Sequence, residues 1–223
     1  MSTTGLEGRG VIVTGGGSGI GRAAALEFAD EGAKVLIADA DEDGATQVVK
    51  TIAYAGGVAG AVVGDLGDPR VGDRIVSTAV ETCGGVDVLV HNAGVLDRLS
   101  AVADTDDDEW ERVVRNGLTA PFLLTRAALP HMTAAGRGSI VFTASEASSR
   151  GSAAGAARTA AQHGVLGLTK SLAVMYRGQG IRTNAIAPGP TCSGIQPVVF
   201  LASDAASDIK GAVLPVDHGW SAV

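Results

Sequence analysis

The chain has 223 residues, of which 46% are hydrophobic and 18% charged, and its formal net charge is −7. A chain of this length and apolar content buries one sizeable core, so we expect a single domain over residues 1–223 and exclude a disordered protein. No run of lysines and arginines forms a basic stripe, so we expect no nucleic-acid partner.

Short and mostly apolar runs are predicted to be strands that are covered on both faces. The first opens the segment RGVIVTGGGSGIG, and the others lie at residues 34–41, 58–65, 86–94, 138–145, 181–189 and 211–217. Helices are expected between most of them, at residues 19–31, 43–55, 68–83, 106–132 and 154–177. This alternation predicts an α/β fold with right-handed crossovers, in which a doubly wound parallel sheet forms the middle of three layers.

A glycine-rich turn follows the first strand and opens the first helix. Glycines there let the backbone approach a pyrophosphate, and the helix N-terminus offers free N–H groups and a positive dipole. The expected cofactor-binding residues of this turn are Thr14, Gly15, Gly17, Ser18, Gly19, Ile20 and Gly21. Asp39 ends the second strand at the spacing from which an acid reaches the ribose hydroxyls of NAD. A glycine turn that binds no ligand is the alternative interpretation.

The acidic stretch DTDDDEW, at residues 104–110, has two interpretations. Aspartates at a helix N-terminus cap free N–H groups and favour the helix dipole. A metal site is the other interpretation, but the oxygen-ligand spacing of a calcium loop is absent. We therefore predict a helix N-terminus here and no metal site.

Four segments resemble motifs of the short-chain dehydrogenase/reductase family. TGGGSGIG resembles that family's TGxxxGxG loop, and HNAG (residues 91–94) resembles its NNAG motif with the first Asn replaced. IRTNAIAPGPT resembles the family's sixth strand and PG turn, and FLASDAASDIKGAVLPVDHGW resembles its C-terminal segment. The resemblance covers nearly the whole chain. It implies a single-domain Rossmann fold, NAD(H) as cofactor, and an oxidoreductase that acts on alcohol or carbonyl groups.

The same resemblance implies further cofactor-binding residues beyond the glycine turn. Asp65 stands where the family's adenine-contacting Asp follows the third strand. The other implied positions are Leu66, Asn92, Ala93, Gly94, Gln162, Pro188, Gly189 and Thr191. Family members associate through the helices expected at residues 106–132 and 154–177, so a homodimer or homotetramer is also implied.

The family's catalytic residues are largely replaced in this chain. The usual set is Asn, Ser, Tyr and Lys, in which Tyr gives a proton to the alkoxide left by hydride transfer and Lys lowers the pKa of that Tyr. Ser145 stands at the Ser position, whereas Arg158 and Gln162, one helical turn apart, stand where the family has Tyr and Lys. Gly117 stands at the Asn position. Asn116 comes one residue early, so we expect it to be turned by about 100° around the helix.

Arginine cannot take over the role of the tyrosine, because its guanidinium is effectively never deprotonated. A second departure follows Ile195, where the family inserts a helical loop that closes over the substrate and this chain runs within a residue into PVVFLASDAAS. Three interpretations stay open. The protein is an NAD-dependent oxidoreductase that works weakly or by unusual groups, a non-catalytic NAD-binding protein, or a non-redox enzyme that uses Ser145 and Arg158.

Cysteine content and apolar runs bear on the cellular compartment. Cys83 and Cys192 are the two cysteines, and no CxxC or Cys/His cluster is present, so we expect no disulfide framework and a cytoplasmic location. The segment MSTTGLEGRG lacks the apolar core of a signal peptide, and no apolar run is long enough to span a bilayer. We therefore expect no membrane partner.

Overall fold

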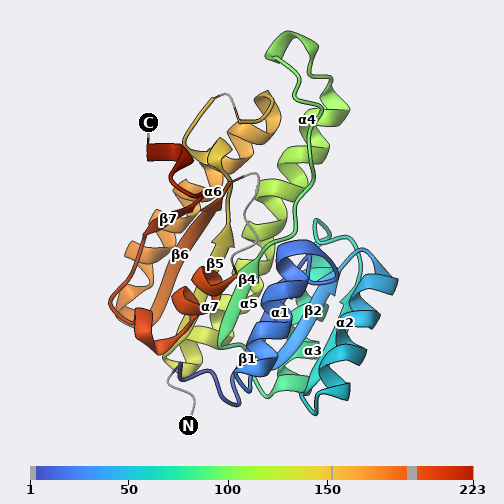
Figure 1. Cartoon of the computed structure of the whole chain (residues 1–223), viewed down its shortest axis with the longest axis vertical. Helices are drawn as coiled ribbons and strands as arrows, with labels where there is room; N and C mark the ends of the chain where they lie inside the picture. The colour runs from blue at the N-terminus through green and yellow to red at the C-terminus, as the bar shows by residue number, and fades with distance from the viewer. Residues whose placement is uncertain (1–3, 152, 190–194, 223) are drawn as a thin grey trace.

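Parallel strands form one seven-stranded sheet in the part of the chain that the computed structural model describes, which is residues 4–151, 153–189 and 195–222. The sheet order is β3-β2-β1-β4-β5-β6-β7 (Figure 1). The strands are β1 (Gly10–Thr14), β2 (Lys34–Asp39), β3 (Ala59–Val63), β4 (Val88–His91), β5 (Gly138–Thr143), β6 (Ile181–Pro188) and β7 (Val213–Val216). Every neighbouring pair is parallel, which confirms the prediction from the alternation of strands and helices.

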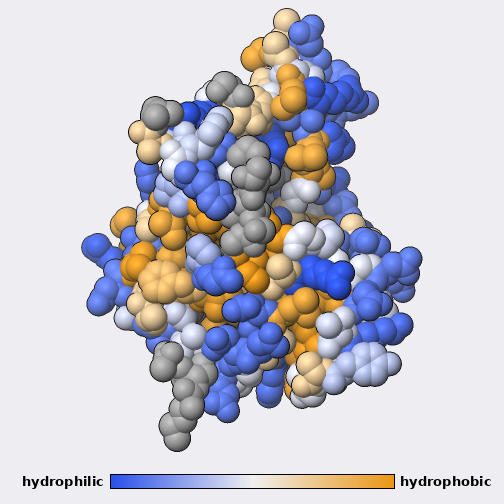
Figure 2. Space-filling view, in the orientation of Figure 1, coloured by the Kyte–Doolittle hydropathy of each residue, from blue (hydrophilic) through white to orange (hydrophobic). Residues whose placement is uncertain are grey.

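Helices cover both faces of the sheet and complete the three layers (Figure 1). One face carries α1 (Gly19–Asp30), α2 (Glu42–Tyr54) and α7 (Gln196–Ala202), and the other carries α3 (Pro69–Cys83), α5 (Ala120–Ala135) and α6 (Ala156–Met175). Figure 2 shows that the outer surface over α2, at the right, is mostly hydrophilic. None of the described helices is long and apolar enough to cross a membrane.

The two cores are divided by the alternation of side chains along each strand. In β1, Val11 and Val13 belong to the core under α1, α2 and α7, whereas Ile12 between them belongs to the core on the other face. All three are fully buried. A strand with both faces covered has no reason to alternate apolar with polar residues, which explains why these strands read as continuous apolar runs.

Acidic caps set the starts of several helices. Asp41 accepts a hydrogen bond from the Asp43 amide at the start of α2, and Asp68 accepts one from the Arg70 amide at the start of α3. In the acidic stretch, Asp106 accepts a hydrogen bond of 2.7 Å from the Glu109 amide and opens α4 (Asp107–Val114). This is the capping arrangement that the sequence predicts. Within the described residues, no group of three or more His, Cys, Asp or Glu side chains could hold a metal ion.

The prediction of a single helix over residues 106–132 is wrong in detail. The structure has α4, then a π-helical turn at Arg115–Thr119, then α5, which continues to Ala135 and ends at Gly136 with φ of +66°. A π turn closes its hydrogen bonds one residue later than an α-helix, and such turns are frequent at functional sites. Gly117 lies inside this turn, where its low helix propensity weakens an ordinary α-helix.

The order of the strands fixes where a cleft can form. From β1 the chain crosses to β2 and then β3 on one side, whereas from β4 it continues to β5, β6 and β7 on the other. The loops that leave the carboxyl ends of β1 and β4 therefore diverge, and open α/β sheets bind ligands in the crevice at such a switch point.

His91 closes β4 and joins it to two neighbouring elements. Its side chain is buried, its Nε2 lies 2.8 Å from the Thr125 Oγ1 of α5, and its ring stacks on Phe142 of β5 with centroids 4.8 Å apart. Burial lowers the pKa of His91 to about 3, so the ring is neutral at physiological pH. A neutral ring lets this histidine serve as a packed core residue at the end of the central strand.

We expect the free energy of unfolding to fall as the pH is lowered from 6.5 toward 3, because the unfolded chain binds a proton at His91 that the folded protein does not. Between pH 6.5 and about 5 the expected loss is about 2 kcal/mol. His91→Asn removes the titrating group and should flatten the curve over this interval. Urea unfolding at several pH values, followed by circular dichroism, measures the slope.

The control for this experiment is His131→Asn, which changes an exposed histidine of α5. In this variant the free energy of unfolding should depend on pH as it does in the unmodified protein. If His91→Asn also keeps that dependence, the pKa of His91 is not lowered in the folded state.

Candidate functional site

A cleft of about 1160 Å³ lies at the carboxyl ends of the strands. Small-molecule sites typically occupy about 300–1,000 Å³, so this one has room for a large ligand. Loops that follow β1 to β6 contribute to its wall, together with α4, the π turn and α6. The predicted site residues that line it are Gly15, Ser18, Gly19, Ile20, Asp39, Asp65, Leu66, Asn92, Ala93, Gly94, Ser145, Arg158, Gln162, Pro188 and Gly189.

Three of the predicted residues that the structure describes do not line the cleft. Thr14, Gly17 and Gly21 are buried at the end of β1, in the loop that follows it and at the start of α1. Thr191 lies outside the described residues, as does the segment 190–194 to which it belongs. The structure therefore divides the predicted residues into those that can contact a ligand and those that support the loop.

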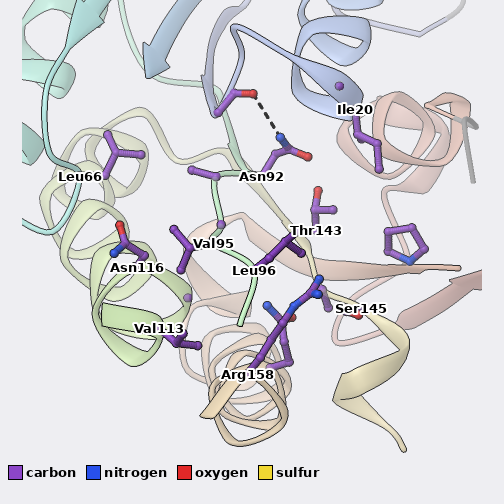
Figure 3. Close-up of a pocket in the computed structure, with 18 of the residues that line it drawn as sticks. Ile20, Leu66, Asn92, Val95, Leu96, Val113, Asn116, Thr143, Ser145 and Arg158 are labelled. Atoms are coloured by element: carbon purple, nitrogen blue, oxygen red, sulfur yellow. Dashed lines mark hydrogen bonds between the residues drawn. The ribbon is translucent and has the colours of Figure 1, made fainter. Parts of the chain in front are cut away.

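The N-terminus of α1 faces the cleft with its N–H groups uncapped. Ser18, at the N-cap position, makes no side-chain hydrogen bond to the first turn, whereas an aspartate caps each of α2, α3 and α4. Ser18, Gly19 and Ile20 line the cleft directly (Figure 3 labels Ile20). Free N–H groups and the positive end of a helix dipole are what a phosphate requires.

The loop before α1 is packed too closely for side chains. A Cβ at Gly21 would lie 2.1 Å from the Gly15 carbonyl oxygen, and one at Gly17 would lie 2.9 Å from the Ala45 nitrogen. Gly15 itself has a φ of +63°, which disfavours any residue with a side chain. These glycines bring α1 and its free N–H groups against the end of β1.

Side-chain hydrogen bonds join this loop to the end of β4. The Thr14 hydroxyl accepts hydrogen bonds from the Asn92 and Ala93 amides, at 3.0 and 3.1 Å. The Asn92 side-chain amide donates to the Gly15 carbonyl at 3.3 Å, which is the dashed line in Figure 3. The two loops that diverge at the switch point are thus tied to each other.

Two acids lie at the end of the cleft formed by β2 and β3. Asp39 accepts hydrogen bonds from the Gly17 and Asp41 amides, at 2.8 and 3.0 Å, and lines the cleft. Asp65 accepts a hydrogen bond from the Gly67 amide and forms an ion pair of 2.7 Å with Arg115 of the π turn. The contact with Arg115 could not be predicted from the sequence, because the two residues are 50 positions apart.

The other end of the cleft carries the positions expected to be catalytic. Ser145 follows β5, and its Oγ accepts a hydrogen bond of 3.3 Å from the Ala147 amide. Arg158 lies in the first turn of α6, and its side chain extends toward Leu96, Thr143 and Ser145 (Figure 3). Gln162, one turn further along α6, also lines the cleft. The expectation that Arg158 and Gln162 share a face holds, and that face is turned to the cleft.

Asn116, which we expected to be turned by about 100° around the helix from the family's Asn position, still lies in the cleft wall. Both Asn116 and Gly117 line the cleft, and Figure 3 shows Asn116 on the side of Leu66 and Val95. The π turn is the reason, because its wider winding changes the angle between successive residues. The Asn116 side chain is already engaged, since its Nδ2 donates a hydrogen bond of 2.9 Å to the Arg112 carbonyl.

Several polar atoms around Ser145 have no hydrogen-bond partner among the residues that the structure describes. They are Thr143 Oγ1, Glu146 Oε1 and Gln162 Oε1, which are buried, and all three residues line the cleft. Glu146 is 4% exposed and was not predicted as a site residue. The sequence did contain a signal for it, because Glu146 is a charged residue directly after Ser145. Buried polar atoms without partners are costly, so this end of the cleft is suited to a ligand that supplies them.

A buried carboxylate holds the loop at the mouth of the cleft. Glu109 of α4 is 1% exposed and accepts hydrogen bonds from the Arg98 amide at 2.6 Å and the Ser100 hydroxyl at 3.1 Å. This anchors the segment after β4, which extends beyond the sheet at the top of Figure 1. Val95 and Leu96, at its start, form an apolar part of the cleft wall.

Taken together, the described residues fit a dinucleotide. The uncapped N-terminus of α1 suits a pyrophosphate, Asp39 can accept hydrogen bonds from sugar hydroxyls, and the unpartnered oxygens near Ser145 can accept them from the second half of the ligand.

Comparisons with known proteins agree with this geometry. The family described as short chain dehydrogenase matches residues 9–201. A 3beta-hydroxysteroid dehydrogenase 2 from Eggerthella lenta is 34% identical over 250 residues, which cover 97% of this chain and 96% of that protein. A cis-4-hydroxycyclohexanecarboxylate dehydrogenase from Sinomonas cyclohexanicum is 38% identical over 240 residues, which cover 95% and 96%.

A solved structure from Beutenbergia cavernae is also similar. That protein was proposed to be an NAD(P)-dependent gluconate 5-dehydrogenase, and its structure contains NADP at low occupancy. The TM-score is 0.90, at 38% identity over 98% of this chain and 99% of that chain.

Proposed function

Because the chain belongs to the short-chain dehydrogenase family, we propose that it binds NAD(H) in this cleft but lacks the family's ordinary alcohol and carbonyl turnover. The observation that carries the proposal is the contrast between the two ends of the cleft. The loop before α1 keeps every feature that a pyrophosphate needs, whereas Arg158 and Gln162 face the cleft where the family has its Tyr and Lys.

Asp39 supports NAD(H) rather than NADP(H) as the ligand. Its carboxylate lines the cleft beside the glycine loop, where it can accept hydrogen bonds from the adenosine ribose. A 2′-phosphate at that ribose would bring like charge close to the carboxylate. The NADP in the Beutenbergia cavernae structure shows what that protein binds, so the choice between the two nucleotides in this chain is our proposal.

Proton transfer is the step for which this chain has no suitable group. A bound nicotinamide donates or accepts a hydride, and a carbonyl that accepts hydride needs a proton. Arg158 cannot readily supply it, because a guanidinium stays protonated at all accessible pH values. Gln162 carries no charge and Gly117 no side chain, so Ser145 is the one member of the family's set that remains at its position.

The short connection before α7 supports the same proposal. Residues 189–195 are all that separate β6 from α7, a connection shorter than the helical lid that follows the PG turn in the family requires. The alignments with the two named dehydrogenases run over 250 and 240 positions, whereas this chain has 223 residues. Each of those proteins therefore contains residues that have no counterpart in this chain. An open reaction end admits water, which weakens electrostatic catalysis.

A non-redox reaction at Ser145 and Arg158 is the second candidate. The observation that favours it is the charge of Arg158, which can stabilise an oxyanion although it cannot protonate one. We also propose a cytoplasmic location, since the two cysteines form no disulfide pattern in the sequence.

We propose in addition that the protein is a homodimer or homotetramer. Trp110 of α4 and Phe122 of α5 are each 45% exposed, and Val174 and Met175 at the end of α6 are 62% and 70% exposed. Large exposed apolar side chains on α4, α5 and α6 favour association through those helices.

The first prediction from the proposed function concerns the choice between NAD(H) and NADP(H). We expect the protein to bind NAD+ at least about fivefold more tightly than NADP+, because a like-charge contact at 4 Å costs about 1 kcal/mol even in water. Asp39→Asn keeps an acceptor for the Gly17 amide but removes the charge, so it should narrow the difference in affinity between NAD+ and NADP+. Isothermal titration calorimetry with both nucleotides measures the two dissociation constants. Asp43→Asn, at an exposed aspartate of α2, should leave the preference unchanged. Equal or tighter binding of NADP+ by the unmodified protein contradicts the role of Asp39.

The second prediction concerns turnover. We expect no ordinary NADH oxidation with ketones or aldehydes, and at most slow, unselective activity after Gly117→Asn, Arg158→Tyr and Gln162→Lys are combined. General acid catalysis contributes about 10²–10⁴ in rate, whereas substrate positioning can contribute about 7–11 kcal/mol, and the triple variant still lacks a lid.

Absorbance of the reduced nicotinamide at about 340 nm follows this reaction over a panel of substrates. Calorimetric NAD+ binding by the triple variant is the control for an intact nucleotide site. Robust turnover by the unmodified protein contradicts the proposal, and family-like turnover by the triple variant shows that the lid is not required.

The third prediction concerns assembly. Light scattering should give the mass of a dimer or tetramer. Phe122→Asp should lower the measured mass, because a buried charge in an apolar interface is costly. Tyr54→Asp is the matched control, since Tyr54 is 93% exposed at the end of α2, away from those helices. A monomer at working concentration would contradict the proposed assembly.

A further inference from the structure

None of the residues that the structure describes forms an ion pair with Arg158. Its side chain is half-buried and lines the cleft, and it makes no hydrogen bond or ion pair with any residue of the described part. Other arginines on the protein are paired, such as Arg115 with Asp65 and Arg98 with Asp106. A guanidinium carries five donors in a planar fork that matches a carboxylate. An unpaired fork in a cleft therefore points to an anionic ligand.

The composition of the wall limits the charge of that ligand. Among the described residues that line the cleft, Arg158 is the one lysine or arginine. A single fixed cation balances one negative charge, which favours a monocarboxylate over a phosphate dianion. Ser145 can add a donor, because its oxygen already accepts from the Ala147 amide and its O–H is free to donate.

The surroundings of the guanidinium suit an organic acid. Figure 3 shows the Arg158 side chain extending between Leu96 and Ser145, with Val95 and Val113 on the same side of the cleft. These aliphatic side chains offer an apolar wall to the body of a ligand whose charged group meets Arg158. Leu96 is 73% exposed, so a ligand can bury it further.

The acids of the cleft do not neutralise Arg158. Asp39 and Asp65 follow β2 and β3, on the far side of β1 from β5. Glu146 is nearer in sequence, but its Oε1 is turned toward β6, where a Cβ on Gly189 would lie 2.8 Å from it. Glu146 forms no ion pair with Arg158.

We propose that Arg158 binds the carboxylate of a small organic acid at this end of the cleft, with Ser145 as a second donor. The inference rests on the proposed function for its location beside the nicotinamide, since it assigns a ligand to the part of the cleft that the dinucleotide leaves open. Arg158 thereby determines ligand specificity by charge instead of transferring a proton.

The test compares benzoate with benzamide, its neutral isostere, by calorimetry on the full chain with NAD+ present and absent. We expect benzoate to bind more tightly than benzamide and its affinity to fall with added salt. Arg158→Gln should weaken benzoate binding by about 10- to 100-fold, because hydrogen bonds to charged groups are worth about 1.5–3 kcal/mol. Arg158→Lys should retain part of the affinity, since it keeps the charge but loses the fork.

Arg177→Gln is the matched control, because it removes one positive charge from an exposed arginine just beyond the other end of α6. It should bind benzoate as the unmodified protein does. Inorganic phosphate is a further probe, and tighter binding of phosphate than of benzoate would overturn the assignment to a monocarboxylate. Equal binding of benzoate and benzamide, no binding of benzoate at millimolar concentration, or unchanged binding in Arg158→Gln would overturn the proposal.

The same titrations separate this inference from the proposed function. Binding of NAD+ without binding of benzoate would support the nucleotide site and contradict the carboxylate site. Binding of benzoate through Arg158 without binding of NAD+ would support the carboxylate site and contradict the proposed function.

Discussion

The close approach of Gly21 to Gly15 is the contact on which the cleft depends. A Cβ at Gly21 would lie 2.1 Å from the Gly15 carbonyl oxygen and 2.5 Å from the Asn92 amide nitrogen, so this position has no room for a side chain. The contact lets α1 begin after a loop of four residues beyond the end of β1, and it leaves the Asn92 amide within hydrogen-bond reach of that loop. Because β1 and β4 lie where the chain turns in opposite directions, one backbone contact holds together the two halves of the site.

The two ends of the cleft differ in how their polar groups are satisfied. At the nucleotide end, Thr14, Asp39 and Asn92 are held by hydrogen bonds to the backbone, so the loop keeps its shape without a ligand. At the other end, Arg158, Glu146 Oε1 and Gln162 Oε1 have no partner within the part of the chain that the structure describes. A preorganised end binds with little reordering, whereas an end with unpaired charges gains most from a ligand that supplies the missing partners.

The fold was predictable from the sequence because its signals are local. Continuous apolar runs identify strands covered on both faces, and the aspartates before α2, α3 and α4 mark helix starts. The π turn was not predictable, because it depends on how the helix packs against α6, where a Cβ at Gly117 would lie 3.3 Å from the Ala161 Cβ. For the same reason the sequence could name Arg158 and Gln162 as neighbours on a face, but could not show that Asn116 shares their cleft or that Glu146 lacks a partner.

At position 158 the family's tyrosine is replaced by an arginine, so the fold places a side chain of different chemistry at the same point of the cleft. Helix α6 holds positions 158 and 162 one turn apart and turned to the cleft, whichever residues stand there. A phenol at position 158 can give up a proton, and its usefulness depends on a neighbouring positive charge that lowers its pKa. A guanidinium cannot give up a proton, but it offers a permanent charge that needs no such neighbour, which is consistent with a neutral glutamine at position 162. The fold places position 158 beside the ligand, and the residue type decides whether that ligand receives a proton or meets a fixed positive charge.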